Sequence, residues 1–248
     1  LGQKYKNYRV IYINDCSPDG TGAAVEAYLQ DRGVEHRTYY YPVDEKESIE
    51  ESTENFRTLV NEERPFFILV NNTTRQGALA NLYRAIYSCD DDEIVVTVDG
   101  DDWLYHKRVL FTLEQAYNRK IVWMTHGRFV DYPHGNASYC LRVPPSIVKN
   151  NTFRSFRCPT HLRTFYAWLF KKIKLEDLLY EGKFYVMTWD MAMMYPMIEM
   201  AGERHAFVEN INYVYNMANQ INDNKVNAEL QRQLDHHIRA LPPYERLP

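Results

Sequence analysis

Two kinds of apolar pattern alternate along the first half of the chain. Short apolar runs that stop at polar turns predict buried strands, and they occupy residues 9–13, 38–43, 66–70, 94–98 and 121–125. Between them, apolar residues recur every three or four positions, which predicts helices at 21–30, 44–63, 78–88 and 107–117. Strands that alternate with helices of about 10–15 residues form a largely parallel sheet with helices on both faces. The pattern therefore predicts an α/β fold.

The alternation weakens beyond Asp131. Residues 133–159 are polar and contain Pro144 and Pro145, so we expect them to meander over the sheet. We expect helices at 162–179, 190–200 and 231–241, and a loop at the Asn- and Gln-rich stretch 216–227. The sequence contains no internal repeat and no evident linker, which favours one continuous domain with a helix-rich second half.

Composition excludes several classes of protein. Of the 248 residues, 45% are hydrophobic and 25% are charged, so the chain is globular rather than disordered. Lys and Arg number 29 against 33 Asp and Glu, which gives a net charge of −4. This balance argues against a protein whose main role is to bind a nucleic-acid backbone.

The cysteines and the apolar runs bear on location. The four cysteines, Cys16, Cys89, Cys140 and Cys158, form no CxxC pair, so we expect neither structural zinc nor disulfides. No apolar run approaches the roughly 20 residues that span a bilayer. We therefore expect a cytoplasmic protein without a transmembrane segment. The short basic run 171–174 leaves a peripheral position at an anionic membrane as an alternative.

The strongest chemical signal is an acidic cluster directly after the strand at 94–98, where Asp99, Asp101 and Asp102 surround Gly100. Crowded carboxylates repel one another, and a divalent cation that bridges them to a phosphate relieves that repulsion. The glycine permits a tight turn and a close approach of a ligand. A strand-ending turn is the alternative interpretation, because Asp and Gly are favoured in turns.

A second polar cluster, residues 14–21, follows the strand at 9–13. Asp15 can accept hydrogen bonds from a nucleobase or a ribose. Asp19 and Thr21 are better suited to closing the turn and capping the next helix. Taken alone, this cluster indicates no more than a capping loop.

Four segments together resemble the family 2 glycosyltransferases, which have the GT-A fold. Residues 11–21 (IYINDCSPDGT) resemble the family's V-D-D-x-S-x-D-G-T signature, and residues 71–81 (NNTTRQGALAN) are similar to its N-x-x-N-x-G-x-x-x-A-x-N segment. Residues 96–102 (VTVDGDD) resemble its metal-binding DxD strand end. Residues 188–195 (TWDMAMMY), with Gly202 downstream, resemble the stretch that holds its catalytic base. The segments keep the family's order, and because they run from residue 11 to residue 202, the resemblance covers most of the chain.

The resemblance implies a site and a reaction. Residues 1–131 would bind the nucleotide-sugar and residues 132–248 the acceptor, within one continuous domain with a Rossmann-type sheet. Asp101 would bind Mn²⁺ or Mg²⁺ against the diphosphate, and Asp190 would be the general base of an inverting transfer. The remaining implied contacts to the donor are Asp15 at the nucleobase, Arg75 near the nucleobase or the diphosphate, Asp99 at the ribose, and Asp102 at the metal or the sugar.

The sequence departs from the family pattern in three places. The family opens with a further strand and helix, and the residues after Leu1 match only the tail of that helix, so part of the base-binding wall is expected to differ. Asn14 stands where an acid is frequent. Where the family usually has two adjacent acids at the catalytic-base segment, this chain has Trp189 and Asp190. Asp190 is then the single candidate for the base, and Trp189 is either a core residue or a platform for a sugar ring.

Two further residues, His161 and Arg163, precede an aromatic segment. If exposed, they would clamp a diphosphate or the acceptor, and the alternative is that they cap and pack a helix start. We expect the adjacent histidines 236–237 to lie on a solvated helix face. The methionines of 191–200 are expected in the core.

The sequence thus predicts a metal-dependent inverting glycosyltransferase with a nucleotide-sugar donor, most simply a UDP-sugar. The acceptor would be a glycan, a protein or a lipid, and nucleic acid is not expected as a partner. One alternative is a nucleotidyltransferase, although no glycine-rich basic loop for a triphosphate is found near the start. The other is a catalytically degenerate module that binds a nucleotide or a glycan.

Overall fold

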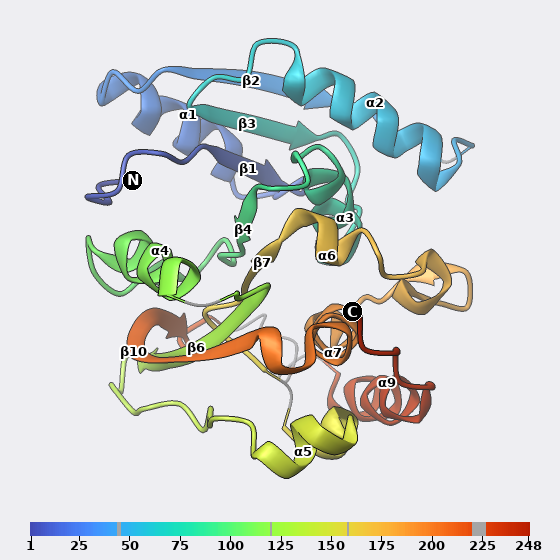
Figure 1. Ribbon diagram of the computed structural model, residues 1–248. Helices are drawn as coiled ribbons and strands as arrows, with labels where there is room; N and C mark the ends of the chain where they lie inside the picture. The colour runs from blue at the N-terminus through green and yellow to red at the C-terminus, as the bar shows by residue number, and fades with distance from the viewer. Residues whose placement is uncertain (44–45, 120, 158, 220–226) are drawn as a thin grey trace. The chain divides into compact units, whose positions relative to one another are not determined.

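The computed structural model describes residues 1–43, 46–119, 121–157, 159–219 and 227–248 (Figure 1). They form two units, which we call the N-terminal unit (residues 6–90) and the C-terminal unit (residues 1–5 and 91–248). Strands and helices occur in both units, so the predicted α/β class is confirmed. The predicted acidic start of a helix at 44–45, the centre of the predicted loop at 216–227, and Cys158 lie outside the described residues.

Three parallel strands form the sheet of the N-terminal unit, in the order β1 (Val10–Asn14), β3 (Phe67–Asn72), β2 (His36–Tyr41). The central strand β3 is buried along its whole length, and its alternate side chains serve opposite faces. Phe67 and Leu69 pack with α1 (Thr21–Asp31), whereas Ile68 and Val70 pack with α2 (Ile49–Asn61) and α3 (Ala78–Tyr87). The prediction of a parallel sheet with helices on both faces is met here.

Local signals explain where these helices begin. Ser48 and Glu51 form a reciprocal capping box at the start of α2, which is why the helix starts later than its apolar pattern suggested. Before α1, the carboxylate of Asp19 accepts hydrogen bonds from the amide and the hydroxyl of Thr21, as expected for a turn-closing residue. Gly22 has no room for a side chain, because a Cβ there would lie 2.2 Å from Oδ1 of Asn71.

The C-terminal unit contains a five-stranded sheet in the order β4-β7-β6-β10-β5. Only the pair β6–β10 is parallel, so this sheet is mixed rather than mostly parallel. Figure 1 shows β6 and β10 side by side. The strands are β4 (Ile94–Val96), β5 (Trp103–Leu104), β6 (Met124–Tyr132), β7 (Thr164–Tyr166) and β10 (His205–Asn216), and a separate hairpin joins β8 (Leu179–Tyr180) to β9 (Lys183–Phe184).

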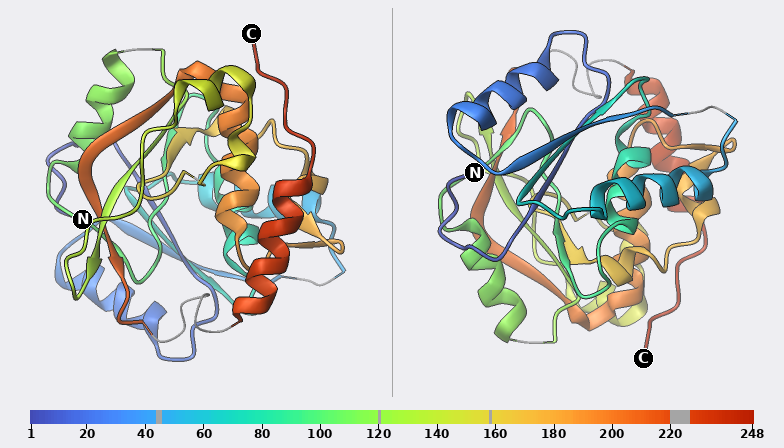
Figure 2. Two further views of the ribbon diagram at one scale, coloured as in Figure 1. Left: turned by 90° about the horizontal axis from the view of Figure 1, so that it is seen from below. Right: turned by 90° about the horizontal axis from the view of Figure 1, so that it is seen from above.

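One buried helix forms the centre of the C-terminal unit. Helix α7 (Trp189–Ala201) is apolar on all sides and buried from Met191 onward, so its methionines are core residues, as predicted. Figure 2 shows α9 (Ala228–Ala240) beside it. Arg154 joins the two helices, because its guanidinium binds Glu199 of α7 at 2.7 Å and the carbonyl oxygen of Ile238. The other helices are α4 (Val109–Arg119), α5 (Pro145–Asn150) and α6 (Ala167–Phe170), with 3₁₀ turns at Phe153–Ser155, Leu175–Leu178 and Gly202–Arg204.

Two predictions about this unit differ from the structure. The helix expected at 162–179 is wrong, because Thr164–Tyr166 forms β7, between β4 and β6, and only Ala167–Phe170 is α-helical. Pairing with two neighbouring strands prevails over the helical spacing of the apolar residues. Strand β10 was not predicted, because shifts in register between Val208 and Tyr213 interrupt its alternation.

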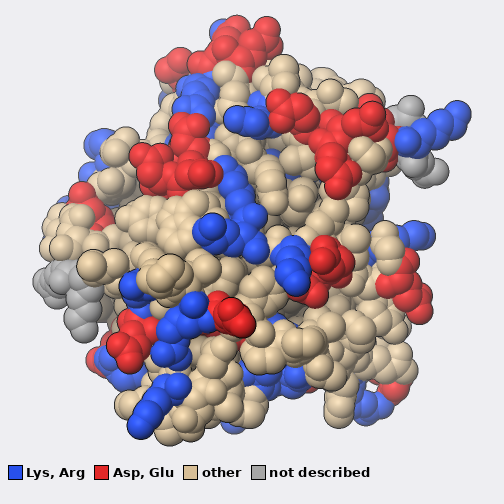
Figure 3. Space-filling model, turned by 45° about the vertical axis from the view of Figure 1, so that its right-hand side comes forward, with Lys and Arg blue, Asp and Glu red and all other residues tan. Residues whose placement is uncertain are grey.

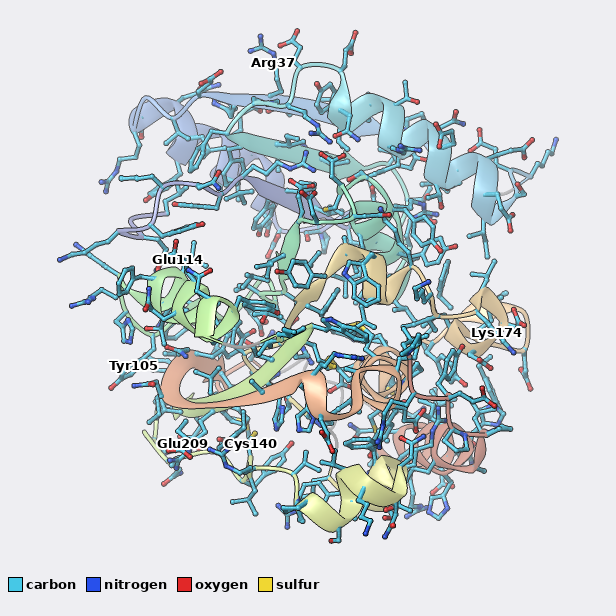
Figure 4. All side chains as sticks on the ribbon, in the orientation of Figure 1. Arg37, Tyr105, Glu114, Cys140, Lys174 and Glu209 are labelled. Atoms are coloured by element: carbon cyan, nitrogen blue, oxygen red, sulfur yellow. The ribbon has the colours of Figure 1, made fainter. Side chains whose placement is uncertain are left out.

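The outer surface gives two further observations. On the face drawn in Figure 3, basic and acidic side chains are interspersed rather than separated into fields of one sign. Lys174 is exposed at the edge of the C-terminal unit (Figure 4), and Lys171 is paired with Asp91 at 2.8 Å.

None of the helices within the described ranges has both the length and the apolar character needed to cross a bilayer.

Candidate functional site

The acidic cluster forms a turn between β4 and β5. The turn is closed by a hydrogen bond from the amide of Asp102 to the carbonyl oxygen of Asp99, at 3.0 Å. Strand β10 fixes its shape from the other side. The hydroxyl of Tyr213 accepts from the amide of Asp99 at 3.1 Å and donates to Oδ2 of Asp102 at 2.6 Å, and the amide of Asn216 donates to Oδ1 of Asp102 at 2.7 Å.

Asp99, Asp102 and His161 form the candidate metal centre. Each offers one ligand atom, and these atoms lie within 4.8 Å of one another. The ring of His161 is buried and stacks on Tyr213, with 4.5 Å between the ring centroids. Its Nδ1 has no hydrogen-bond partner among the described residues. Two carboxylates and a buried imidazole with an unpaired nitrogen are a donor set that fits a divalent cation.

The electrostatics of the candidate metal centre favour the binding of a cation. Burial raises the pKa of Asp102 to about 6 despite hydrogen bonds from Tyr213 and Asn216, and Asp99 adds to the rise. Burial also raises the pKa of Asp99, although the charge of Arg163 opposes it. The pKa of His161 lies well below its usual value because its ring is buried and faces Arg163. A divalent cation would offset the crowding of negative charge and use a histidine that is already neutral.

Arg163 connects the candidate metal centre to Asp190. Its side chain is only 2% exposed, and its guanidinium donates to Asp99 at 3.2 Å and to Asp190 at 3.3 Å. The guanidinium also lies over the ring of Trp189, 4.9 Å from the centroid. Of the two alternatives for His161 and Arg163, a ligand clamp of exposed side chains does not fit, because both side chains are buried. Both belong to the interior because β7 carries this segment into the sheet.

Asp190 lies in the first turn of α7 and keeps 30% of its side chain exposed. Oδ1 accepts from the amide of Met191, and Oδ2 accepts from Arg163. The carboxylate is thus held in one orientation and remains accessible, which suits a group that takes up a proton. It borders an open cavity of about 500 Å³.

Asp101, the metal ligand expected from the sequence, has a different setting. Its Oδ2 accepts from Nδ2 of Asn219 at 2.6 Å. It is not one of the three residues whose ligand atoms converge. A direct role of Asp101 at the metal stays a prediction.

Asp15 lies in the N-terminal unit, directly after β1, and its carboxylate organises the neighbouring loop between β3 and α3. Oδ1 accepts from Nδ2 of Asn72 and from the amide of Gln76, and Oδ2 accepts from the amide of Gly77, each at 2.8 Å. Burial would raise the pKa of Asp15, but these bonds and one from Asn81 outweigh it and hold the pKa below its usual value. The carboxylate therefore stabilises the loop that precedes α3.

Arg75 lies on the same loop, and its side chain is exposed. Among the residues described in the N-terminal unit, no hydrogen bond or ion pair holds its guanidinium. Contact of Asp15 and Arg75 with a nucleotide stays a prediction. Asn14, a departure from the family pattern, donates to Oδ1 of Asn71 at 2.8 Å and so joins β1 to β3 at their carboxyl ends.

The sequence did not indicate the residues of β10 and its continuation that shape the acidic turn. Tyr213, Asn216 and Asn219 bind Asp102 and Asp101, yet they carry no motif and lie more than a hundred positions further along the chain. Only the pairing of β10 with β5 and β6 brings Tyr213 to the turn.

Comparisons with known proteins add the following. No family model matches the chain, and no curated protein sequence is similar to it. Among solved structures, a mannosyltransferase from Pyrobaculum calidifontis in complex with GDP-Man and Mn²⁺ matches 86% of this chain at 17% identity and a TM-score of 0.49. The chain spans 50% of the length of that protein.

Two other solved structures match more of their own length. A glucosyl-3-phosphoglycerate synthase from Mycobacterium tuberculosis, in complex with Mn²⁺, UDP-Glc and phosphoglyceric acid, matches at 11% identity and a TM-score of 0.43, over 96% of this chain and 89% of that one. A mannosyl-3-phosphoglycerate synthase from Rubrobacter xylanophilus matches at 12% identity and a TM-score of 0.39, over 94% of this chain and 83% of that one. Identities of 11–17% with TM-scores below 0.5 assign no function to this protein.

Proposed function

We propose that this protein is a metal-dependent glycosyltransferase that moves a sugar from a nucleotide-sugar donor to an acceptor hydroxyl with inversion. The observation that supports it best is the position of Arg163. One buried guanidinium binds Asp99 of the candidate metal centre and Asp190 at 3.2 and 3.3 Å. A metal-bound diphosphate and a general base would therefore face the same small region, as displacement of a nucleoside diphosphate requires.

Asp99, Asp102 and His161 would hold the metal. When bound, the cation supplies charge neutralisation for the departing diphosphate. The donor set favours Mn²⁺ over Mg²⁺, because Mg²⁺ prefers oxygen ligands and water, whereas Mn²⁺ also accepts an imidazole nitrogen. Asp101 is retained in the proposal as a group that approaches the metal from the same turn.

Asp190 would act as the general base. Its carboxylate is accessible, and the hydrogen bonds from Arg163 and Met191 fix its direction. An acceptor hydroxyl placed against it would lose its proton as its oxygen attacks the anomeric carbon. Attack from the face opposite the leaving group gives inversion.

The remaining parts of the proposal rest on the sequence resemblance. They comprise a GT-A fold of family 2 with a nucleotide-binding part at 1–131 and an acceptor-binding part at 132–248, donor contacts from Asp15 and Arg75, UDP as the nucleotide, and a cytoplasmic location. In the nucleotide-binding part, the loop that Asp15 holds would provide the surface on which the nucleobase of the donor lies. Asp102 contacting the sugar rather than the metal is the alternative within the same site.

A product assay tests the proposal directly. The protein is incubated with UDP-glucose or GDP-mannose and Mn²⁺, and released nucleoside diphosphate, free sugar and pyrophosphate are measured separately. A glycosyltransferase releases the nucleoside diphosphate. Without an acceptor, it still does so slowly, because water hydrolyses the donor. A parallel incubation contains a nucleoside triphosphate and a sugar phosphate, and release of pyrophosphate there would indicate the nucleotidyltransferase instead. Nucleotide binding without any turnover would indicate the degenerate module.

A further inference from the structure

A cavity of about 500 Å³ in the C-terminal unit is lined by Asp190 and by residues of α9. Its lining includes Asp190 and Thr160, the residue before His161, together with Gln231 and His236 of α9. A volume of this size suits a small ligand. The cavity adjoins the proposed base, yet the donor-binding residues of the proposed function do not line it.

The charges of the lining are compensated at every position except one. Arg239 binds Asp235 at 2.8 Å and two backbone carbonyl oxygens, and Arg232 pairs with Glu229. Asp190 is paired with Arg163. Arg157 lies over the ring of Tyr139, 5.3 Å from the centroid, and within the described ranges no carboxylate pairs with it.

A guanidinium without a carboxylate partner, on the wall of a cavity that the proposed general base also lines, indicates the chemistry of the occupant. Arg binds phosphate and carboxylate with two parallel hydrogen bonds, and stacking on an aromatic ring fixes the plane of the guanidinium. Thr160, Gln231 and His236 add polar groups that can bind hydroxyls.

We propose that this cavity is the acceptor site and that the acceptor is a small hydroxy compound bearing a phosphate or a carboxylate, which Arg157 binds while the reacting hydroxyl lies at Asp190. The inference rests on the proposed function, whose acceptor it specifies. The step itself is a displacement. The acceptor oxygen forms a bond to the anomeric carbon, the bond to the diphosphate breaks, the diphosphate leaves with that electron pair, and the hydroxyl proton passes to Asp190.

The first test is binding without metal and without donor, so that it does not depend on turnover. Matched ligands are titrated by calorimetry: glucose 6-phosphate against glucose, and glycerol 3-phosphate and glycerate against glycerol. We expect the anionic member of a pair to bind about tenfold to a hundredfold more tightly, as for hydrogen bonds to a charged group. The phosphate and carboxylate compounds then show which anion the site prefers.

Variants locate the effect. Arg157→Gln should remove the preference for the anionic ligand, and Arg157→Lys should keep part of it, since a lysine retains the charge but not the paired hydrogen bonds. The matched control is Arg108→Gln, because Arg108 is also exposed and also stacks on an aromatic ring, 5.2 Å from the centroid of Phe111, but does not line the cavity. The control should bind all ligands as the unaltered protein does.

The second test adds donor and Mn²⁺ and compares transfer to the same pairs of acceptors. Donor hydrolysis together with a preference for anionic acceptors that Arg157→Gln abolishes supports the inference. Donor hydrolysis with equal use of neutral and anionic acceptors overturns the inference and leaves the proposed function intact. Absence of both donor hydrolysis and nucleotide binding overturns the proposed function. If anionic ligands bind only when Mn²⁺ is added, or bind equally to Arg157→Gln, the cavity is not their site.

Discussion

Two acidic clusters at the ends of strands, alike in sequence, have opposite electrostatics in the structure. In the N-terminal unit, the carboxylate of Asp15 accepts three hydrogen bonds of 2.8 Å from Asn72, Gln76 and Gly77, and its pKa lies below the usual value. In the C-terminal unit, burial and neighbouring carboxylates raise the pKa values of Asp99 and Asp102, and an unpaired histidine nitrogen lies beside them. The first cluster is satisfied by the protein, whereas in the second Arg163 compensates only part of the negative charge.

The difference shows what an acidic motif can and cannot indicate. A carboxylate saturated by backbone amides contributes to the fold whether or not it also touches a ligand. Carboxylates held close together without enough donors destabilise the folded protein until a cation binds. The second arrangement is the one expected of a metal centre.

The largest effect is expected from Asp190→Asn. The amide keeps the size and one acceptor atom but cannot take up the proton, so transfer should fall by about 10²–10⁴-fold. Mn²⁺ and UDP affinities, measured by calorimetry, should stay within about twofold. Asp92→Asn, a substitution of an exposed residue in the same unit, is the control and should be fully active. Parallel losses of donor affinity and rate in Asp190→Asn would indicate a structural role.

The next effect tests the histidine of the metal centre. His161→Phe keeps the ring that stacks on Tyr213 but removes the ligand nitrogen, so Mn²⁺ affinity should fall at least about tenfold. The matched control is His126→Phe, since His126 is also buried and stacked on neighbouring rings but lies outside the candidate metal centre. Titration of free Mn²⁺ by electron paramagnetic resonance measures both. Equal affinities in the two variants would exclude His161 as a ligand.

A smaller effect is expected on the free energy of unfolding, which Asp15 should influence without influencing metal binding. Asp15→Asn replaces an acceptor oxygen by an NH₂ group facing backbone amides, and should lower the free energy of unfolding by about 1–3 kcal/mol in urea titrations. Mn²⁺ affinity should not change. Asp19→Asn in the same loop is the control, because Asp19 is exposed and serves only Thr21. A greater loss of stability in Asp19→Asn than in Asp15→Asn would contradict the role given to Asp15.

The smallest effect is a pH dependence of the metal-free protein. The folded pKa of Asp102 is about 6, above its unfolded value, so the folded state binds this proton more tightly and stability falls as the pH rises from about 4 to 6. Allowing for partial exposure, the stability of the unaltered protein relative to Asp102→Asn should fall by about 1–2 kcal/mol between pH 4 and pH 7.

Asp15 supplies the matched comparison for that pH dependence. Its folded pKa is lowered, so its contribution to stability is present above the unfolded pKa and is lost only in stronger acid. The stability difference between the unaltered protein and Asp15→Asn should therefore be nearly flat from pH 4 to pH 7. Parallel pH profiles for the two variants, followed by urea unfolding, would remove the electrostatic distinction between the clusters.

The parts of the structure that depend on local sequence could be predicted. The strands and helices of the N-terminal unit follow their apolar patterns, because the central strand β3 is buried on both faces and each helix packs one apolar side against the sheet. The acidic turn and the helix that begins beside Asp190 were also evident, since both are short motifs at the end of a strand or the start of a helix.

The parts that depend on pairing across the chain could not be predicted. His161 joins Asp99 and Asp102 because β7 pairs with β4 and β6, and the residues of β7 had been assigned to a helix. The burial of Arg163 follows from the same pairing. Tyr213 reaches the turn through β10, a strand whose interrupted alternation concealed it. Spacing along the sequence carries no information about these contacts.

The most direct test of the candidate metal centre is diffraction from crystals grown with Mn²⁺ and UDP, with data collected at the manganese absorption edge. The account predicts one anomalous peak within ligand distance, about 2.0–2.4 Å, of a carboxylate oxygen of Asp99 or Asp102 and of a ring nitrogen of His161, next to the diphosphate. A peak bound by Asp101 without His161, or a bound nucleotide with no metal beside these residues, would contradict it.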